Sequence, residues 1–166
     1  MNHQTDRRKQ GFTIIEVMIV LAIAGLIMLI VFLAVPAVQR SGRNTQRHAD
    51  TSAVAGAIAN YITNNGGTVP AAVSVSGNDL LICGASCATG NTETAKLGYY
   101  TPANISLLTN AASLSTPPAR DTIVIDVGYN CNASNTGLGS ASARTAAVLF
   151  AVETGSSAIA QQCVEQ

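Results

Sequence analysis

The sequence has little charge and few aromatic residues. Charged side chains make up 11% of the 166 residues, and Trp is absent altogether. This share lies well below the roughly one quarter that is usual in a soluble domain. The formal net charge is zero, so the charge balance gives no indication of a nucleic-acid partner.

The sequence also lacks the residue groups that catalysis requires. His3 and His48 are the only histidines, and we expect His48 to lie at the surface. The acidic residues beyond residue 66 are scattered, with no pair or metal-loop spacing, and no glycine-rich phosphate loop occurs. We therefore expect no catalytic residue, no cofactor and no metal, and a protein that is not an enzyme. Abundant Ala, Ser, Thr, Gly and Asn suit a solvated extracellular module.

One long apolar run stands out. No charged residue occurs from Val17 to Val38, which is long enough to predict a membrane span. A secretory signal peptide would have an apolar core about half as long. Arg7, Arg8 and Lys9 precede the run and favour a cytoplasmic N-terminus, with the rest of the chain on the other side.

Glu16 lies just inside the apolar run. A charged residue costs about 2.5–3.5 kcal/mol at the centre of a membrane helix and less toward the interface. One interpretation is a Glu in the interfacial first turn, where the helix dipole favours it. The other is a functional carboxylate that needs a partner.

The string KQGFTIIE, residues 9–16, resembles the prepilin signature of type IV pilins and their relatives. The resemblance implies cleavage between Gly11 and Phe12 by a prepilin peptidase, followed by N-methylation of Phe12. It is close over about the first forty residues. Beyond residue 70 it is a resemblance of layout alone.

The chemistry of the junction agrees with that resemblance. Gly11 has no side chain, so an extended substrate fits a tight protease site. Cleavage would create an amine on Phe12 that is largely protonated, since such amines have a pKa of about 7.7–8.0. Glu16 lies one helical turn away and could pair with this amine within one chain. The family resemblance instead implies a pair with the Phe12 amine of a neighbouring subunit, which would set the registry between subunits.

A long helix is expected to continue beyond the membrane. Val54, Ile58 and Tyr61 recur at helical spacing, and the sequence NNGG at residues 64–67 predicts the helix end. Gly25 and Pro36 are expected to make the first half flexible, Pro36 through a kink.

Three arginines form a stripe just outside the predicted membrane segment. Arg40, Arg43 and Arg47 fall at positions i, i+3 and i+7. Two hypotheses remain open at this point: a solvated face near lipid headgroups, or a surface for subunit contacts.

The remainder predicts an α+β fold, in which a small antiparallel sheet of three to five strands packs on the outer half of the helix. The segment between Cys83 and Arg120 is expected to be mostly loop, and residues 154–157 predict a hairpin turn. The expected strands are residues 80–82, 122–127, 146–153 and 158–164.

The four cysteines all follow the apolar run, which predicts disulfides in an oxidising compartment. A bond between Cys131 and Cys163 would close a loop of about 33 residues and contribute about 3–4 kcal/mol, against about 2 kcal/mol for Cys83–Cys87. The loop that Cys131 and Cys163 would close lies near the chain end and resembles the D-region of type IV pilins. Four cysteines allow three pairings, and a four-cysteine zinc site would lack paired C-x-x-C knuckles.

These features predict four segments: a leader (1–11), a membrane and filament-core helix (12–38), an outer helix (39–66) and a disulfide-bonded β-rich domain (67–166). The resemblance implies a single-pass membrane precursor that becomes a subunit of a helical surface filament for adhesion, twitching motility or DNA uptake. Its implied partners are further copies of itself, the prepilin peptidase, the pilus assembly machinery, and DNA or a host surface. Alternatives are a minor pilin, a type II secretion pseudopilin, or a membrane-anchored binding module that does not polymerise.

Overall fold

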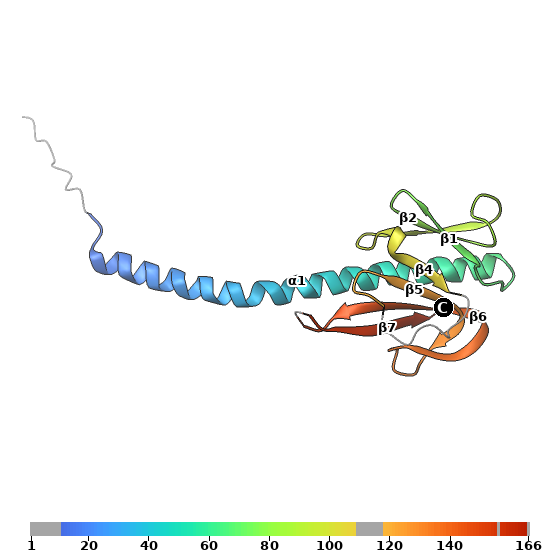
Figure 1. Ribbon diagram of the computed structural model, residues 1–166. Helices are drawn as coiled ribbons and strands as arrows, with labels where there is room; N and C mark the ends of the chain where they lie inside the picture. Colours follow the sequence, from blue (N-terminus) through green and yellow to red (C-terminus); the bar gives the residue numbers. More distant parts are fainter. Residues whose placement is uncertain (1–10, 109–117, 156, 166) are drawn as a thin grey trace, which may run out of the picture. The chain divides into compact units, whose positions relative to one another are not determined.

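The computed structural model describes residues 11–108, 118–155 and 157–165. Of the predicted leader, residues 1–11, only Gly11 is therefore among the described residues. The chain divides into two compact units, Met1–Gln39 and Arg40–Gln166, and each is described by itself below. Figure 1 shows the elements in sequence colours.

Helix α1 (Ile14–Asn64) has 51 residues and contributes to both units. It continues through Gly25 and Pro36. Its C-terminal end is a glycine cap. Gly66 has a φ of 65°, which an L-residue rarely adopts, and the Gly67 N–H donates to the Ile62 carbonyl at 2.8 Å. This pairing satisfies a carbonyl that the helix leaves free, so the chain turns away there.

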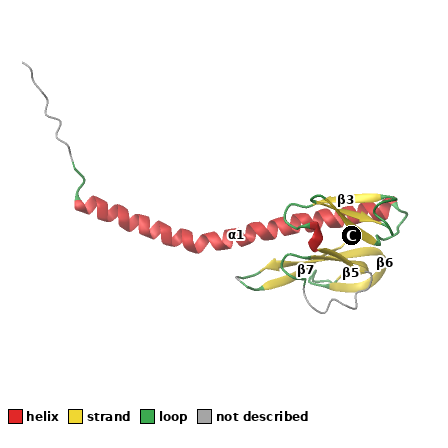
Figure 2. Cartoon of the chain, turned by 45° about the horizontal axis from the view of Figure 1, so that its top comes forward, coloured by secondary structure: helices red, strands yellow, loops and turns green. Residues whose placement is uncertain are grey.

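The second unit contains two sheets, which Figure 2 shows as separate groups of strands. The first has the order β1–β2–β3 and is antiparallel throughout. The second has the order β4–β5–β6–β7, in which β4 and β5 are parallel and the other pairs are antiparallel. The strands are β1 (Ala72–Ser76), β2 (Asp79–Cys83), β3 (Thr92–Lys96), β4 (Ile105–Leu108), β5 (Ile123–Cys131), β6 (Leu138–Glu153) and β7 (Ile159–Glu165), and the short helix η1 (Pro102–Asn104) precedes β4.

The predicted α+β class is confirmed, but the predicted single sheet is wrong. The described residues form seven strands in two sheets, and the segment expected to be loop contains β3 and β4. Strand β3 reads TETAK and buries only Ala95, so its sequence has little of the apolar pattern of a strand. Strand β4 has only four residues, and it pairs with a strand that begins at Ile123. Neither strand can therefore be recognised from its own residues alone.

The main core lies between the outer part of α1 and both sheets. Val54 and Ile58 on α1 have no exposed surface, and they belong to one cluster with residues of β2, β5 and β6. The alternation of side chains along β5 explains this, because every second residue faces α1. The sheet residues in this cluster include Leu80, Ile82, Ile123, Ile125, Val148 and Phe150.

The opposite face of the second sheet is covered by the end of the β5–β6 hairpin. Cys131 and Leu138, which pair across that end, pack against Val124 and Leu149. Two register shifts follow Val127, and bulges of this kind bend strands. Residues 146–153 of β6 are therefore buried on both faces.

Asp126 is the polar exception beneath this cover. It lies on β5 opposite Ala147, is fully buried, and neither carboxylate oxygen has a hydrogen-bond partner among the described residues. Burial raises its pKa above the ordinary value, because the charged form is poorly solvated there. A raised pKa means that the stability contribution is full below the unfolded pKa and is lost as the pH rises through the folded pKa.

Replacing Asp126 with Asn should stabilise the domain at neutral pH, since it removes the charge and keeps the shape. An unpartnered buried group costs about 1–3 kcal/mol and more when charged, so we expect a gain on the order of 1 kcal/mol at pH 7 that shrinks toward pH 3. Thermal melts followed by near-ultraviolet circular dichroism of the tyrosines would measure it. Asp79→Asn is the matched control, and a gain of equal size there, or none in Asp126→Asn, would contradict the assignment.

Candidate functional site

The start of α1 is a capping box formed by Thr13 and Glu16. The Thr13 N–H donates to Glu16 Oε2 at 2.8 Å, and the Thr13 hydroxyl donates to the same oxygen at 2.7 Å. The Thr13 hydroxyl oxygen also accepts from the Glu16 N–H at 3.3 Å. These bonds satisfy groups that a helix N-terminus leaves unpaired, so the Glu16 carboxylate has a partner within its own chain.

Sequence reasoning missed Thr13. The pattern T-x-x-E directly before an apolar run is a known signature of a helix start, and it would have identified the residue. The uncleaved chain has a peptide nitrogen on Phe12 in place of an amine. The Phe12 side chain is 90% exposed. The structure thus brings Glu16 to Thr13, and a pair between Glu16 and a Phe12 amine stays a prediction about the cleaved chain.

The described part of the first unit exposes its apolar side chains on all sides. Every described residue from 11 to 39 is exposed. Among the described residues, α1 is the one helix long and apolar enough to cross a membrane. A helix that is hydrophobic all round is stable only where lipid or protein covers it.

Two members of the predicted arginine stripe, Arg43 and Arg47, bind carboxylates of the second unit. Arg47 is fully buried, which overturns both surface hypotheses for it, whereas the Arg43 side chain is 40% exposed. Arg43 Nη2 lies 2.7 Å from Glu153 Oε2, and Arg47 Nη1 lies 2.9 Å from Glu153 Oε1. Arg47 also donates to Asp121 Oδ1 at 3.1 Å, and its side chain has no exposed surface. Their acidic partners are more than 70 residues away in sequence, so spacing along the helix could not reveal them. Arg40 is half-buried.

Two further helix residues in this part of the second unit bind backbone groups. Asn44 donates to the Glu153 carbonyl and accepts from the Glu153 N–H, both at 2.9 Å. Asp50 accepts three backbone N–H groups, from Gly98, Tyr99 and Tyr100, at 2.7–2.9 Å. These contacts join residues 44–50 of α1 to the end of β6 and to the loop before η1. His48 is exposed and meets Phe150 edge to face.

The two arginines determine the pKa of Glu153. The hydrogen bond from Arg43, together with that from Arg47, lowers the pKa of Glu153 to about 2, although burial opposes the shift. A lowered pKa means that the stabilisation is full above the ordinary pKa of 4.5 and is lost as the pH falls toward 2. The carboxylate is therefore ionised at neutral pH.

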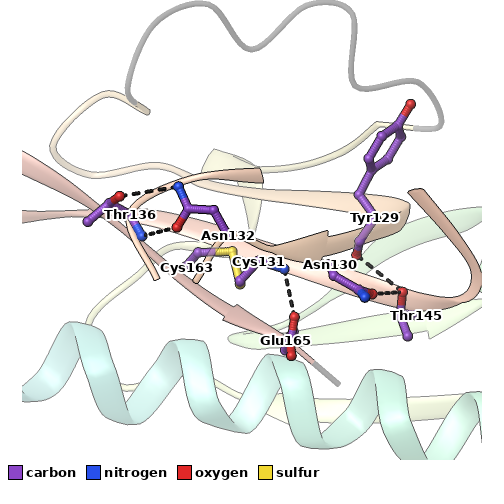
Figure 3. The surroundings of a disulfide bond; sticks show 8 residues. All are labelled: Tyr129, Asn130, Cys131, Asn132, Thr136, Thr145, Cys163 and Glu165. Carbon is purple, nitrogen blue, oxygen red and sulfur yellow. Dashed lines mark hydrogen bonds between the residues drawn. A yellow bond between two sulfur atoms is a disulfide. The ribbon is translucent and has the colours of Figure 1, made fainter. Parts of the chain in front are cut away.

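Both pairs of cysteines are disulfide-bonded. Cys83 joins Cys87, and Cys131 joins Cys163 across 32 residues, with Cα atoms 5.7 Å apart. Figure 3 shows the second bond and its surroundings. Glu165 accepts the Cys131 N–H at 2.7 Å, so the end of the β5–β6 hairpin is joined to β7 by a covalent bond and a hydrogen bond.

A turn completes the attachment of this hairpin end. The Asn132 side chain accepts the Thr136 N–H at 2.9 Å, and the Asn135 carbonyl accepts the Cys163 N–H at 2.8 Å. Asn135 has a φ of 53°, a conformation that Asn tolerates better than most residues. No group of three or more metal-ligating side chains occurs among the described residues.

The N-terminal junction also has a counterpart among known families. A family model described as the prokaryotic N-terminal methylation motif matches residues 6–32, which include Gly11, Phe12 and Glu16. No curated protein and no solved structure matched the chain.

Replacing Glu153 with Gln should destabilise the second unit, because Arg47 would stay buried with only Asp121 as an acidic partner. Removing one partner of a buried pair costs about 3–5 kcal/mol, and we expect the lower end. Between pH 5 and pH 2 the melting temperature of the unaltered protein should fall as Glu153 is protonated, and the variant should lose part of that fall. Near-ultraviolet circular dichroism would follow both. Glu93→Gln is the control, and equal acid sensitivity in Glu153→Gln and the unaltered protein would contradict the pairing.

Proposed function

Because the chain carries a prepilin-type N-terminal methylation motif, we propose that it is a structural subunit of a type IV pilus-like surface filament. The match confirms the resemblance of residues 9–16 to a prepilin signature. The motif supports a pilin-like or pseudopilin protein and implies cleavage by a prepilin peptidase and assembly into pilus-type filaments. The single observation that carries the proposal is this motif at the start of a helix whose apolar part, up to residue 39, is exposed on every side.

The proposed sequence of events begins at the membrane. The precursor is anchored by the apolar part of α1, with the basic residues Arg7, Arg8 and Lys9 on the cytoplasmic side. Cleavage after Gly11 removes that basic segment, and Phe12 becomes a methylated N-terminal amine. The exposed side chains of residues 12–38 then leave lipid for the core of a filament, where neighbouring helices cover them.

Glu16 is proposed to set the registry between subunits. In the free chain, the capping box already holds its carboxylate, so anchoring in the membrane needs no neighbour. Oε2 accepts both bonds from Thr13, and no described residue donates to Oε1. In the proposed filament, the amine of a neighbouring Phe12 pairs with this carboxylate. Burial of the pair in an apolar core makes a mismatched stagger costly.

Other parts of the chain have supporting roles in this proposal. Gly25 and Pro36 supply the flexibility that the helix needs on entering a filament. The domain from residue 67, strengthened by the Cys83–Cys87 and Cys131–Cys163 bonds, faces the outside of the cell. Adhesion, twitching motility and DNA uptake are the proposed uses, with the assembly machinery and DNA or a host surface as partners. A minor pilin or a type II secretion pseudopilin would share every feature of the junction, and a non-polymerising membrane module would retain its leader.

The mature N-terminus gives the first test. In cells with a prepilin peptidase, the mature chain should begin at Phe12 and carry one added methyl group, which mass spectrometry of the N-terminal peptide would detect. Gly11→Val should block the cleavage, because a branched side chain would fill the narrow space that the glycine leaves. Gly25→Val, within the apolar run, is the control. An intact Met1 terminus, with all of the protein in the membrane fraction, would refute the proposal.

Substitutions of Glu16 separate its charge from its role in the helix cap. Glu16→Ala should abolish filaments while leaving insertion and cleavage intact. Glu16→Gln retains an oxygen for the capping box but has no charge, so it should also abolish filaments if the amine pair sets the registry. Electron microscopy of sheared surface material would score assembly.

Thr13→Ala is the matched control, because it removes the capping hydroxyl and keeps the Glu16 carboxylate. We expect it to retain filaments, although the loss of a cap weakens the helix start by about 1 kcal/mol. Filaments in Glu16→Gln together with their loss in Thr13→Ala would assign the residue to capping and would refute the registry role.

A further inference from the structure

A pocket of about 340 Å³ lies in the second unit, beside the loop that precedes η1. Its lining residues are Tyr99, Tyr100, Thr101, Asn104 and Asp121. Ligand pockets typically range from about 300 to 1,000 Å³, so this one has room for a single small unit. None of these residues belongs to the N-terminal junction, and the pocket has no part in the proposed assembly.

The pocket wall is held rigidly before any ligand arrives. Asp50 binds the backbone N–H groups of Gly98, Tyr99 and Tyr100, and the Pro102–Asn104 turn follows directly. The rings of Tyr99 and Tyr100 meet edge to face, with centroids 5.3 Å apart. A preformed wall favours binding, because little conformational entropy remains to be lost.

The charge of the pocket is balanced. Asp121 Oδ1 accepts from Arg47 at 3.1 Å and from the Tyr99 hydroxyl at 2.9 Å, while Oδ2 has no partner among the described residues. The Asp121 side chain is 61% exposed. Arg43 and Arg47 offset Asp121 and Glu153. No Lys or Arg lines the pocket, which disfavours an anion, and Asp121 already has a cationic partner, which weakens the attraction for a second cation.

The remaining polar groups of the pocket both donate and accept hydrogen bonds. These are the hydroxyl of Thr101 and the amide of Asn104. Both side chains are exposed, and the Thr101 hydroxyl makes no helix-capping hydrogen bond. Tyr100 is 4% exposed, and its hydroxyl is buried without a partner among the described residues. Burial raises the pKa of Tyr100, so this hydroxyl stays protonated, but a ligand in the pocket cannot reach it.

We propose that this pocket binds one neutral monosaccharide unit. Sugar hydroxyls donate and accept at once, and they match the carboxylate oxygen of Asp121, the amide of Asn104 and the hydroxyl of Thr101. Asp121 Oδ2 accepts from one sugar hydroxyl, and the exposed side chains of Thr101 and Asn104 pair with its neighbours. The same chemistry suits a free hexose and the terminal unit of a glycan.

The test titrates the full mature chain in micelles of a detergent without a sugar headgroup. Galactose, mannose, glucose and N-acetylglucosamine, free and as methyl glycosides, are added up to about 50 mM, because a single small site often binds only in the millimolar range. We expect at least one sugar to shift the amide resonances of Gly98, Tyr99 and Tyr100. A methyl glycoside that binds as well as the free sugar identifies a glycan terminus, and binding of the free sugar alone identifies a free hexose.

Three variants and their controls decide whether the pocket is the site. Thr101→Ala and Asn104→Ala each remove an exposed hydrogen-bonding side chain, so the fold should be unaffected while affinity falls about threefold or more, the loss of one hydrogen bond. Thr101→Ala with Asn104→Ala should weaken binding further. Tyr129→Phe and Thr94→Ala are the matched controls and should bind normally.

Three results would overturn the proposal. One is the absence of shifts with every sugar, and another is equal affinity in the pocket variants and the controls. The third is tighter binding of ethylammonium than of any sugar, which would show that Asp121 attracts cations despite Arg47.

Discussion

The apolar surface of residues 11–39 is the constraint on which the rest depends. A helix with hydrophobic side chains on every face cannot remain in water, because each exposed side chain gives up stabilisation that burial would provide. Lipid can cover such a surface, and so can copies of the same helix. Glu16 imposes the same requirement in both environments, because its carboxylate needs a polar partner in either one. Thr13 supplies that partner in the free chain.

The second unit solves a different problem, which is how to hold a small β-rich domain on part of one helix. Apolar packing begins at Val54, about two turns beyond Arg47. Between these points α1 uses polar contacts, and Arg47, Asp50 and Asn44 bind groups from three distant segments. Polar contacts have directional geometry, so they define where the loop before η1 and the end of β6 attach. This rigidity is also what forms the pocket at Tyr99 and Asp121.

The disulfides stabilise a domain whose strands are poor in large apolar residues. Strands β1 and β3 are short and together bury only Ala95, and the larger side chains are concentrated in β2, β5 and β6. The Cys131–Cys163 bond joins the end of the β5–β6 hairpin to β7, which protects the second small core. The same cover buries Asp126, whose carboxylate has no hydrogen-bond partner among the described residues. This burial destabilises the domain.

Local patterns determined the apolar helix, its end at the glycines, the α+β class and the junction around Gly11, Phe12 and Glu16. Each depends on residues within a few positions of one another, so the sequence alone is sufficient. The tertiary structure alone decided that there are two sheets and that β4 pairs with β5 in parallel, because those partners are distant in the chain. It also decided that Arg47 is buried against Glu153, more than 100 residues away. An arginine on a helix predicts a solvated face. Its burial is tolerated here because a carboxylate from β6 pairs with it and offsets the cost of removing its charge from water.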